Sequence, residues 1–132
     1  MSEAGARGAF ARGAHAIEAF GGGGFRFAGM SHVGSILATP KGVSAVGATV
    51  IVDLDAAAFQ RLFEELAAEP GLVEFVVIGT GAKMALAPQG LAAALRAKGL
   101  RLEAMATGPA SRVYNIMIGE GRRVAALLLA AP

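Results

Sequence analysis

The second half of the chain alternates short apolar runs with amphipathic segments, and this order restricts the fold more than any other feature. The apolar runs are 73–78 (VEFVVI), 100–105 (LRLEAM) and 122–129 (RRVAALLL). Between them, one helix is predicted from Pro88 to Gly99, and a second from a cap at Thr107 to Gly119. The order strand, helix, strand, helix, strand is typical of an α/β domain. The unit over 73–105 is therefore expected to be a right-handed parallel crossover.

The first half of the chain is predicted to form short strands followed by one helix. The expected strands are 25–28 (FRFA), 35–39 (SILAT) and 48–53 (ATVIVD), with glycine and proline residues in the turns. Asp55 is predicted to cap a helix that runs to about Ala68. The apolar side of this helix is Phe59, Leu62, Phe63 and Leu66. Glu64 and Glu65 are neighbours that point apart, and a solvated face is expected for both.

Length and composition predict one domain and exclude several kinds of function. A chain of 132 residues with 55% hydrophobic content can bury its own core. We expect a flexible tail over 1–14 and a single domain over 15–132. The 12 basic and 10 acidic side chains nearly cancel, and the basic ones are scattered, which disfavours nucleic-acid binding. Cysteine is absent and His15 and His32 are the only histidines, so no metal site and no cofactor are predicted.

No membrane-spanning segment is predicted. The longest apolar run, 124–131 (VAALLLAA), is far shorter than the ~20 residues that a spanning helix needs. The N-terminal stretch MSEAGARGAFARGAHA lacks an apolar core of signal-peptide length. We therefore expect a soluble, cytoplasmic protein, with a peripheral position at the inner membrane, through a partner, as a further option.

Two loops are predicted to meet at one edge of the sheet. In a parallel crossover, 79–83 (GTGAK) and 107–112 (TGPASR) both follow the carboxyl ends of strands. Ligands of open α/β sheets bind at this edge, where helix N-termini present free N–H groups to anions. The second loop adds Arg112 and two hydroxyl groups, from Thr107 and Ser111. This pattern is compatible with a small anion-accepting crevice.

Simpler explanations exist for most of these residues. GTGAKM lacks the third glycine of a dinucleotide motif and the spacing of a phosphate loop, so Gly79 and Gly81 can serve a tight turn alone. Thr107 is explained by helix capping. Arg112 and Asn115 have no such local explanation and remain open between function and bonds to neighbouring loops.

The polar residues outside this crevice give two further predictions. Lys83 and Tyr114 are the only plausible proton carriers near the two loops, which favours binding without turnover. No catalytic residue is predicted. Glu120, Arg122 and Arg123 flank the turn before the last strand, either as a surface charge cluster or as the start of a partner-binding edge.

The segment 105–127, MATGPASRVYNIMIGEGRRVAAL, resembles the signature of a small domain of unknown function found in bacteria, archaea and mitochondria. That family includes mitochondrial respiratory complex I assembly factor 3 and an adipogenesis-associated animal protein. The similarity runs from about Ile17 to Leu129. Supporting pieces are Gly24-Phe25, the run from His32 through Gly34-Ser35 to Pro40, and Ile78-Gly79-Thr80-Gly81.

Three positions depart from the family pattern. Ala106 stands where an acidic residue is usual, Ser111 where cysteine is frequent, and Val46 where tryptophan is common. This chain lacks the acid and the thiol at these positions, so it cannot perform chemistry that depends on either group. The departures argue against catalysis.

The resemblance implies a three-layer α/β domain with a mixed central sheet, antiparallel N-terminal strands and a C-terminal βαβαβ half. It implies a role in protein association during biogenesis of a respiratory membrane complex, and it brings no reaction or cofactor. The surface positions that it carries over are Gly79, Thr80, Gly81, Thr107, Arg112, Tyr114, Asn115, Glu120 and Arg122.

Two hypotheses about function follow. In the first, the chain is a non-enzymatic interaction protein that assists assembly of respiratory complex I, through the crevice around Arg112 and Asn115 or the turn at 120–123. A protein partner is expected, and self-association is a further option. In the alternative, the 79–83 loop and the N-terminus of the Thr107 helix bind a small anion.

Overall fold

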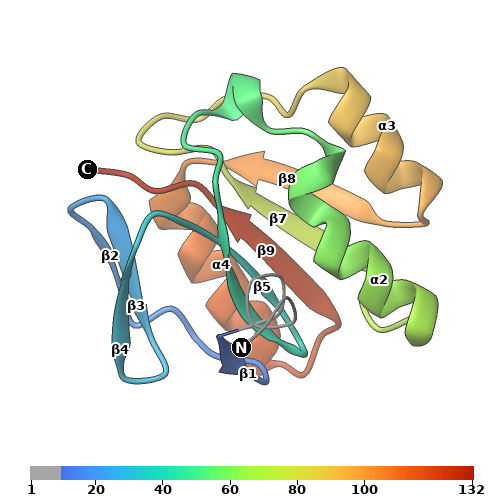
Figure 1. Cartoon of the computed structure of the whole chain (residues 1–132), viewed down its shortest axis with the longest axis horizontal. Coiled ribbons are helices and arrows are strands. Elements are labelled where there is room, and N and C mark those ends of the chain that lie inside the picture. The colour runs from blue at the N-terminus through green and yellow to red at the C-terminus, as the bar shows by residue number, and fades with distance from the viewer. Residues whose placement is uncertain (1–9) are drawn as a thin grey trace.

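The computed structural model describes residues 10–132, which form a six-stranded sheet and a three-stranded sheet (Figure 1). The order of the larger sheet is β1, β6, β5, β9, β7, β8. Its strands are β1 (Ala11–Arg12), β5 (Ser35–Thr39), β6 (Gly42–Val46), β7 (Phe75–Gly79), β8 (Arg101–Met105) and β9 (Val124–Leu128). β7 is parallel to β8 and β9, whereas β5 is antiparallel to β6 and β9. The mixed sheet and the βαβαβ half are confirmed.

Helices cover both faces of this sheet (Figure 1). They are α2 (Gln60–Ala68), α3 (Gln89–Ala97) and α4 (Thr107–Gly119). Strand side chains alternate between faces, so Val76 and Ile78 pack with α2 and α3, while Val77 packs with α4. Full burial of each such side chain contributes ~1.5–3 kcal/mol. Two apolar layers on one sheet give the predicted three-layer domain.

The smaller sheet is an antiparallel meander that packs on the α4 side. Its strands are β2 (Ala19–Gly21), β3 (Gly24–Phe27) and β4 (Met30–Val33). Ala28 and Gly29 form the two-residue turn between β3 and β4, and both have positive φ, 51° and 73°. Turns of this kind match the twist of the two strands that they join. The buried rings of Phe25 and Phe27 belong to the same apolar cluster as Tyr114.

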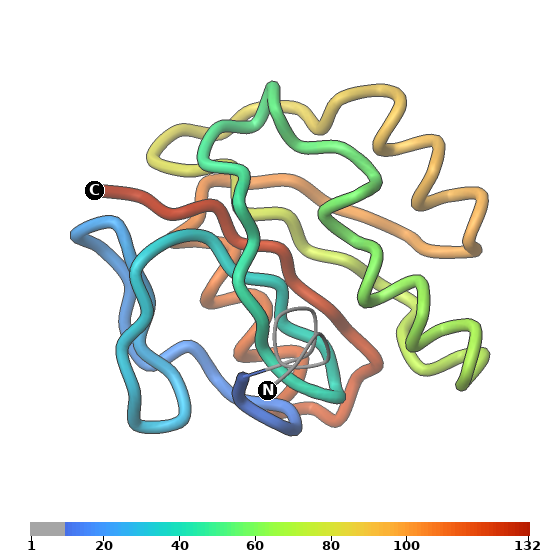
Figure 2. Tube along the Cα trace, in the orientation of Figure 1, coloured from blue at the N-terminus to red at the C-terminus, as the bar shows by residue number. Residues whose placement is uncertain are grey.

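One predicted strand is wrong, and four strands, β1, β2, β4 and β6, were not predicted. Residues 48–53 do not extend the sheet, and Ile51–Asp53 form a short 3-10 helix, η1. The strand in this region is β6, which pairs with β5 through a hairpin. Val46 lies opposite Ser35, the first residue of β5, so β5 has no residue left to pair with 47–53. The chain therefore leaves the sheet and crosses to α2 (Figure 2).

The predicted helix over 55–68 consists of two parts. A 3-10 turn, η2 (Ala56–Phe59), leads directly into α2. The Asp55 side chain accepts a hydrogen bond from the Ala57 N–H at 3.1 Å, which confirms Asp55 as the cap. The other helices and strands of the second half differ from prediction by a few residues at their ends.

The two ends of the predicted domain can be compared with the structure only in part. Residues 1–9 of the expected tail lie outside the described residues. Within 10–14, Ala11 and Arg12 form β1 and pair with Val43 and Gly42. From residue 10 onward, no helix is long and apolar enough to cross a membrane.

Candidate functional site

The two predicted loops do meet, at the end of the sheet where β7, β8 and β9 finish. We call this the carboxyl end; β6 also ends there and β5 begins there. The Thr107 N–H donates to the Gly81 carbonyl at 2.9 Å, and the Gly81 N–H donates to the Thr107 hydroxyl oxygen at 2.9 Å. The Thr107 hydroxyl in turn donates to the Leu129 carbonyl at 2.7 Å. One buried hydroxyl therefore ties together the segments that follow β7, β8 and β9.

The predicted capping role of Thr107 is replaced by this bridge. Thr107 is the first residue of α4, Ala106 precedes the helix, and no side chain caps its N-terminus. Gly79 is explained by the same packing, because a Cβ there would lie 2.9 Å from the Thr107 hydroxyl oxygen and 2.9 Å from Leu128 Cδ2. A side chain at 79 would push these neighbours apart.

The polar groups of the first loop, 79–83, are bonded within the protein. The Thr80 N–H donates to the Met105 carbonyl at 2.8 Å, and the Thr80 hydroxyl donates to the Lys83 carbonyl at 2.6 Å. Gly81 has a φ of 101° and supports the turn, while Lys83 is exposed. The loop amides of Thr80 and Gly81, which the crevice hypothesis assigned to an anion, are thus bonded within the protein.

Ser111 and Tyr114 lie inside the protein rather than on a rim. The Ser111 hydroxyl donates to the Thr107 carbonyl at 2.8 Å, one helical turn earlier. Tyr114 is fully buried, and its hydroxyl has no partner among the described residues. Burial raises the pKa of Tyr114 to about 12, although positive Arg61 acts in the opposite direction. Tyr114 is therefore a neutral core residue at ordinary pH and is a poor proton carrier.

Tyr114 gives a direct test because it is the only tyrosine and tryptophan is absent. We expect the phenol to ionise near pH 12 in the native protein, against 10 in an unfolded chain. A raised folded pKa means that the associated stability is complete below the unfolded pKa and is lost as the pH rises from about 10 to about 12. Absorbance at the phenolate band measures the pKa of Tyr114 in the native protein. Urea unfolding at each pH measures the stability. Tyr114→Phe should remove this part of the alkaline dependence, and native ionisation near 10 would contradict the prediction.

Asn115 and Arg112 have different environments on α4. The Asn115 side chain accepts from the Ile17 N–H at 2.8 Å and donates to the Ile17 carbonyl at 2.9 Å. Asn115 therefore fixes the segment before β2, which is one of the two explanations that the sequence left open. Arg112 is exposed and, within residues 10–132, has no hydrogen-bond or ion-pair partner.

Glu120, Arg122 and Arg123 lie at the opposite end of the sheet, before β9 begins. Arg123 donates to the Gly71 carbonyl at 2.9 Å and pairs with Glu74 at 3.3 Å. The twelve candidate residues predicted from the sequence therefore divide between the two ends of the sheet and α4. They do not surround a single site.

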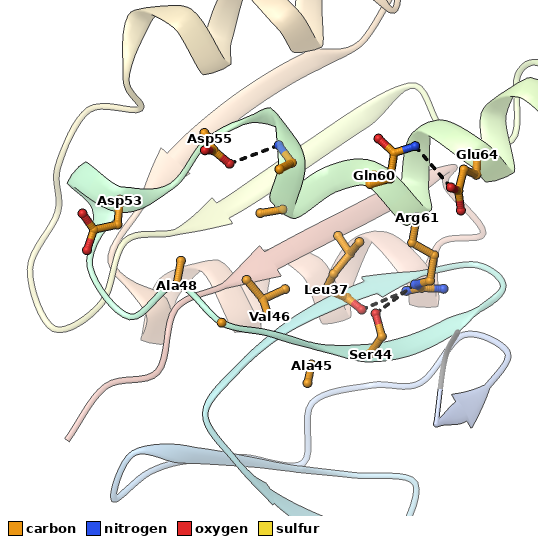
Figure 3. Close-up of a pocket in the computed structure, with 13 residues that line it drawn as sticks. Leu37, Ser44, Ala45, Val46, Ala48, Asp53, Asp55, Gln60, Arg61 and Glu64 are labelled. Carbon is orange, nitrogen blue, oxygen red and sulfur yellow. Dashed lines mark hydrogen bonds between the residues drawn. The ribbon is translucent and has the colours of Figure 1, made fainter. Parts of the chain in front are cut away.

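A groove of about 460 Å³ lies elsewhere, between β6 and the segment that leads into α2 (Figure 3). Leu37, Val46 and Ala48 line its apolar part, and Asp53 and Asp55 lie towards one end. This groove could not be predicted from the sequence, because its walls are separated along the chain and β6 itself was not predicted.

Arg61 lines the other end of the groove, where Figure 3 shows its bonds to Leu37 and Ser44. Its five N–H groups donate to Ser44 Oγ, Thr39 Oγ1, the Glu65 carboxylate, and the carbonyls of Leu37 and Gly42. Burial lowers the pKa of Arg61, and Glu65, at 2.6 Å, opposes this shift. The expected solvated face is wrong for Glu65, since its side chain is only 14% exposed. Arg61 holds α2 to the β5–β6 hairpin and is not free to bind an anion.

Several exposed apolar side chains belong to segments at the carboxyl end. Five of the nine large exposed hydrophobic residues among 10–132 lie in segments that precede β5 or follow β6 or β7 there, and a sixth, Phe20, lies against the first turn of α4. We call this set the apolar rim: Phe20, Val33, Val50, Val52, Met84 and Leu86. Val33, Val52 and Leu86 are 84%, 80% and 81% exposed. Phe20 joins the rim because its ring lies against Gly108 in the first turn of α4.

The topology explains why the rim forms. Val33 precedes β5, the η1 segment with Val50 and Val52 follows β6, and the loop with Met84 and Leu86 follows β7. Figures 1 and 2 show the last two segments over the same end of the sheet. Within the described part of the chain, no three His, Asp or Glu residues form a group that could hold a metal ion. The segments at the carboxyl end thus expose several large apolar side chains beside the charged side chains of Asp53 and Lys83.

Comparison with known proteins gives consistent matches. The profile of the family described as "Protein of unknown function (DUF498/DUF598)" matches residues 17–129. An uncharacterised protein of Rhodobacter capsulatus is 39% identical over 123 residues, covering 91% of this chain and 88% of that protein.

Solved structures agree. A crystal structure described as an outer membrane protein from Bartonella henselae has a TM-score of 0.83 and 38% identity, over 92% of this chain and 98% of that one. An NMR structure of a Rhodopseudomonas palustris protein has a TM-score of 0.76 and 42% identity, over 100% of this chain and 94% of that one. The chain therefore belongs to the DUF498/DUF598 family, which includes mitochondrial respiratory complex I assembly factor 3.

Proposed function

We propose that this chain is a non-enzymatic interaction protein that binds its partner through the apolar rim. The observation that carries the proposal is that six large exposed apolar side chains belong to, or contact, segments at one end of the sheet. Single exposed apolar residues are ordinary, but several together mark a surface that another protein covers. The rim replaces the crevice around Arg112 and Asn115 as the central contact, with Arg112 at its margin.

The hydrogen bonding at the carboxyl end supports a protein partner over a small anion. An anion at the 79–83 loop would compete with the internal bonds of the Thr80 and Gly81 amides. The first turn of α4 is covered by the Phe20 ring at Gly108. Phosphate or sulfate is therefore expected to leave the melting temperature unchanged beyond the effect of ionic strength.

The proposed role is assistance in assembling respiratory complex I. Family membership supports this role, because mitochondrial assembly factor 3 belongs to the same family. The relative from Bartonella henselae is described as an outer membrane protein. This description supports a role near a membrane. We place this protein at the membrane periphery through its partner.

The test is affinity capture from a native bacterial extract with wild type and the double variant Val52→Ser, Leu86→Ser. Both side chains are about four-fifths exposed, so the variant should fold normally, within about 0.5 kcal/mol of wild type. We expect it to lose capture of complex I subunits or their assembly factors, because truncating the apolar centre of an interface costs most of the affinity.

Two matched variants separate the rim from the other candidate surfaces. Ile116→Ser changes an apolar residue that is 59% exposed on α4, and Arg122→Ala changes the turn at the opposite end of the sheet. Both control variants should still capture the same partner proteins as wild type. If the rim variant captures the same partners as wild type, the rim is not the contact surface. If only Arg122→Ala loses partner capture, the contact surface is the turn at 120–123.

A further inference from the structure

The two edges of the larger sheet differ. At one edge, the two-residue strand β1 lies beside β6. At the other edge, β8 has five residues and, among residues 10–132, pairs only with β7 (Figure 1). Native proteins usually keep edge strands short or cover them, because an open edge pairs readily with another strand. A five-residue edge strand is therefore a candidate contact surface.

The hydrogen bonds of β8 show which of its backbone groups face this edge. The Arg101 N–H and the Met105 carbonyl both form hydrogen bonds on the β7 side, at 3.0 Å and 2.8 Å. Alternate residues of a strand direct their N–H and C=O groups to opposite sides, so Leu102 and Ala104 direct theirs outward. Within the described residues, no group forms a hydrogen bond with these outward N–H and C=O groups.

The start of the described chain lies at the opposite edge of the sheet. The Phe10 N–H donates to the Val43 carbonyl of β6 at 2.9 Å. Five strand steps, from β1 to β8 and about 4.8 Å each, separate the two edges. Leu102 and Ala104 themselves are only partly buried. The backbone of β8 is thus available for pairing with a further strand.

The side chains of β8 carry opposite charges at alternate positions. Met105 packs on the α4 side of the sheet, so Arg101 and Glu103 share that face. Both are exposed, and neither has an ion-pair partner in the part of the chain that the structure describes. Leu102 and Ala104 lie on the other face, against the apolar cluster under α2 and α3.

From the edge and the charges together, we propose that β8 pairs with β8 of a second copy of this chain, antiparallel and centred on Leu102. The two Leu102 residues exchange N–H···O=C bonds across the two-fold axis, and each Ala104 N–H donates to the Leu100 carbonyl of the other copy. In this register, Arg101 of each copy lies directly opposite Glu103 of the other. The two larger sheets become one continuous sheet.

The charge pattern selects both the register and the occupant. Centring the pair on Glu103 would place the two Glu103 side chains opposite each other, and centring it on Ala104 would place Glu103 opposite Met105. Like charges in opposed positions destabilise a strand pair, and opposite charges stabilise it. A strand with charges of one sign would match Arg101 or Glu103 but not both, whereas a second copy matches both. This pairing goes beyond the proposed function, because it uses a surface distinct from the apolar rim.

The first test follows self-association of the full chain by sedimentation equilibrium and by amide hydrogen exchange. We expect a monomer–dimer equilibrium. Exchange at Leu102 and Ala104 should slow about fivefold or more as the protein concentration rises from about 20 μM to about 1 mM. The Glu103 N–H faces β7 in the monomer and the dimer alike, so its exchange should change less than about twofold.

Charge reversal tests the register. Arg101→Glu and Glu103→Arg each replace two contacts of opposite charge by two contacts of like charge, and each should weaken the dimer about tenfold. An equimolar mixture of the two variants should associate within about threefold of wild type, because every charge then faces an opposite one again.

Two control variants alter the net charge by the same amounts away from β8. Arg26→Glu lies on β3, and Glu120→Arg lies in the turn after α4. Both positions are exposed, so the chain should fold normally. Each control should change the dimer affinity less than about twofold.

Several results would overturn the pairing of two β8 strands. A monomer at every concentration would do so, as would slow exchange of Leu102 and Ala104 in dilute protein, which would mean that the same chain already covers the edge. Association that both charge reversals leave unchanged would place the contact elsewhere. If Val52→Ser with Leu86→Ser abolishes association while both reversals leave it intact, the rim is the self-contact. Partner capture is measured separately, so either proposal can fail alone.

Discussion

Replacing Arg61 by methionine is expected to lower the free energy of unfolding by about 3–5 kcal/mol, because it leaves the buried partner charge uncompensated. The Arg61 side chain is 11% exposed and that of Glu65 is 14% exposed. The change also leaves the carbonyls of Leu37 and Gly42 without these donors. Urea unfolding followed by circular dichroism measures the loss.

A double variant separates the ion pair from the packing. In Arg61→Met with Glu65→Leu, both charges are replaced by apolar side chains, so the unpaired charge disappears. We expect the double variant to be more stable than Arg61→Met alone, even though it carries one more change. Arg96→Met, at an exposed position on α3, serves as the control and should stay within about 0.5 kcal/mol of wild type. A small effect of Arg61→Met would mean that the guanidinium network contributes little to stability.

Thr107→Val is expected to destabilise the protein by about 2–4 kcal/mol. Valine has the shape of threonine, so the change removes the hydroxyl with little effect on packing volume. The Gly81 N–H and the Leu129 carbonyl each lose a partner in a buried environment, at about 1–3 kcal/mol per group. Urea unfolding gives the total. Hydrogen exchange at Gly81 shows whether the carboxyl end opens first.

Thr107→Ser is the matched comparison for this site. Serine retains the hydroxyl and loses one methyl group, which costs about 1 kcal/mol. We therefore expect Thr107→Val to lower the free energy of unfolding more than Thr107→Ser does. The opposite order would show that Thr107 acts through its methyl group and that the hydroxyl bridge between the three segments is unimportant.

Family membership and most of the second half of the fold could be predicted from the sequence. The run over 73–78 and the segments around Pro88 and Thr107 each have a single period that fits one type of element. The first half was harder. β6 (GVSAV) consists of small residues with little apolar contrast, whereas 48–53 is richer in valine and isoleucine and yet lies outside the sheet.

The candidate residues show a similar division. Thr107 was correctly placed at the start of a helix, but its hydroxyl bonds Gly81 and Leu129, which only the sheet brings within reach. Arg61 was missed because an arginine followed four residues later by a glutamate resembles an ordinary surface pair. Its other acceptors lie 17 to 24 residues earlier in the chain.

The sequence by itself determined the elements whose apolar periodicity is local, and with them the α/β class and the βαβαβ order. Local spacing is enough there, because a helix or strand buries a face that its own residues define. Only the tertiary structure decided where the apolar rim, the Arg61 network and the groove beside β6 lie. Each is built from segments far apart in the chain, and the parallel and antiparallel pairing of the sheet is what brings their ends together.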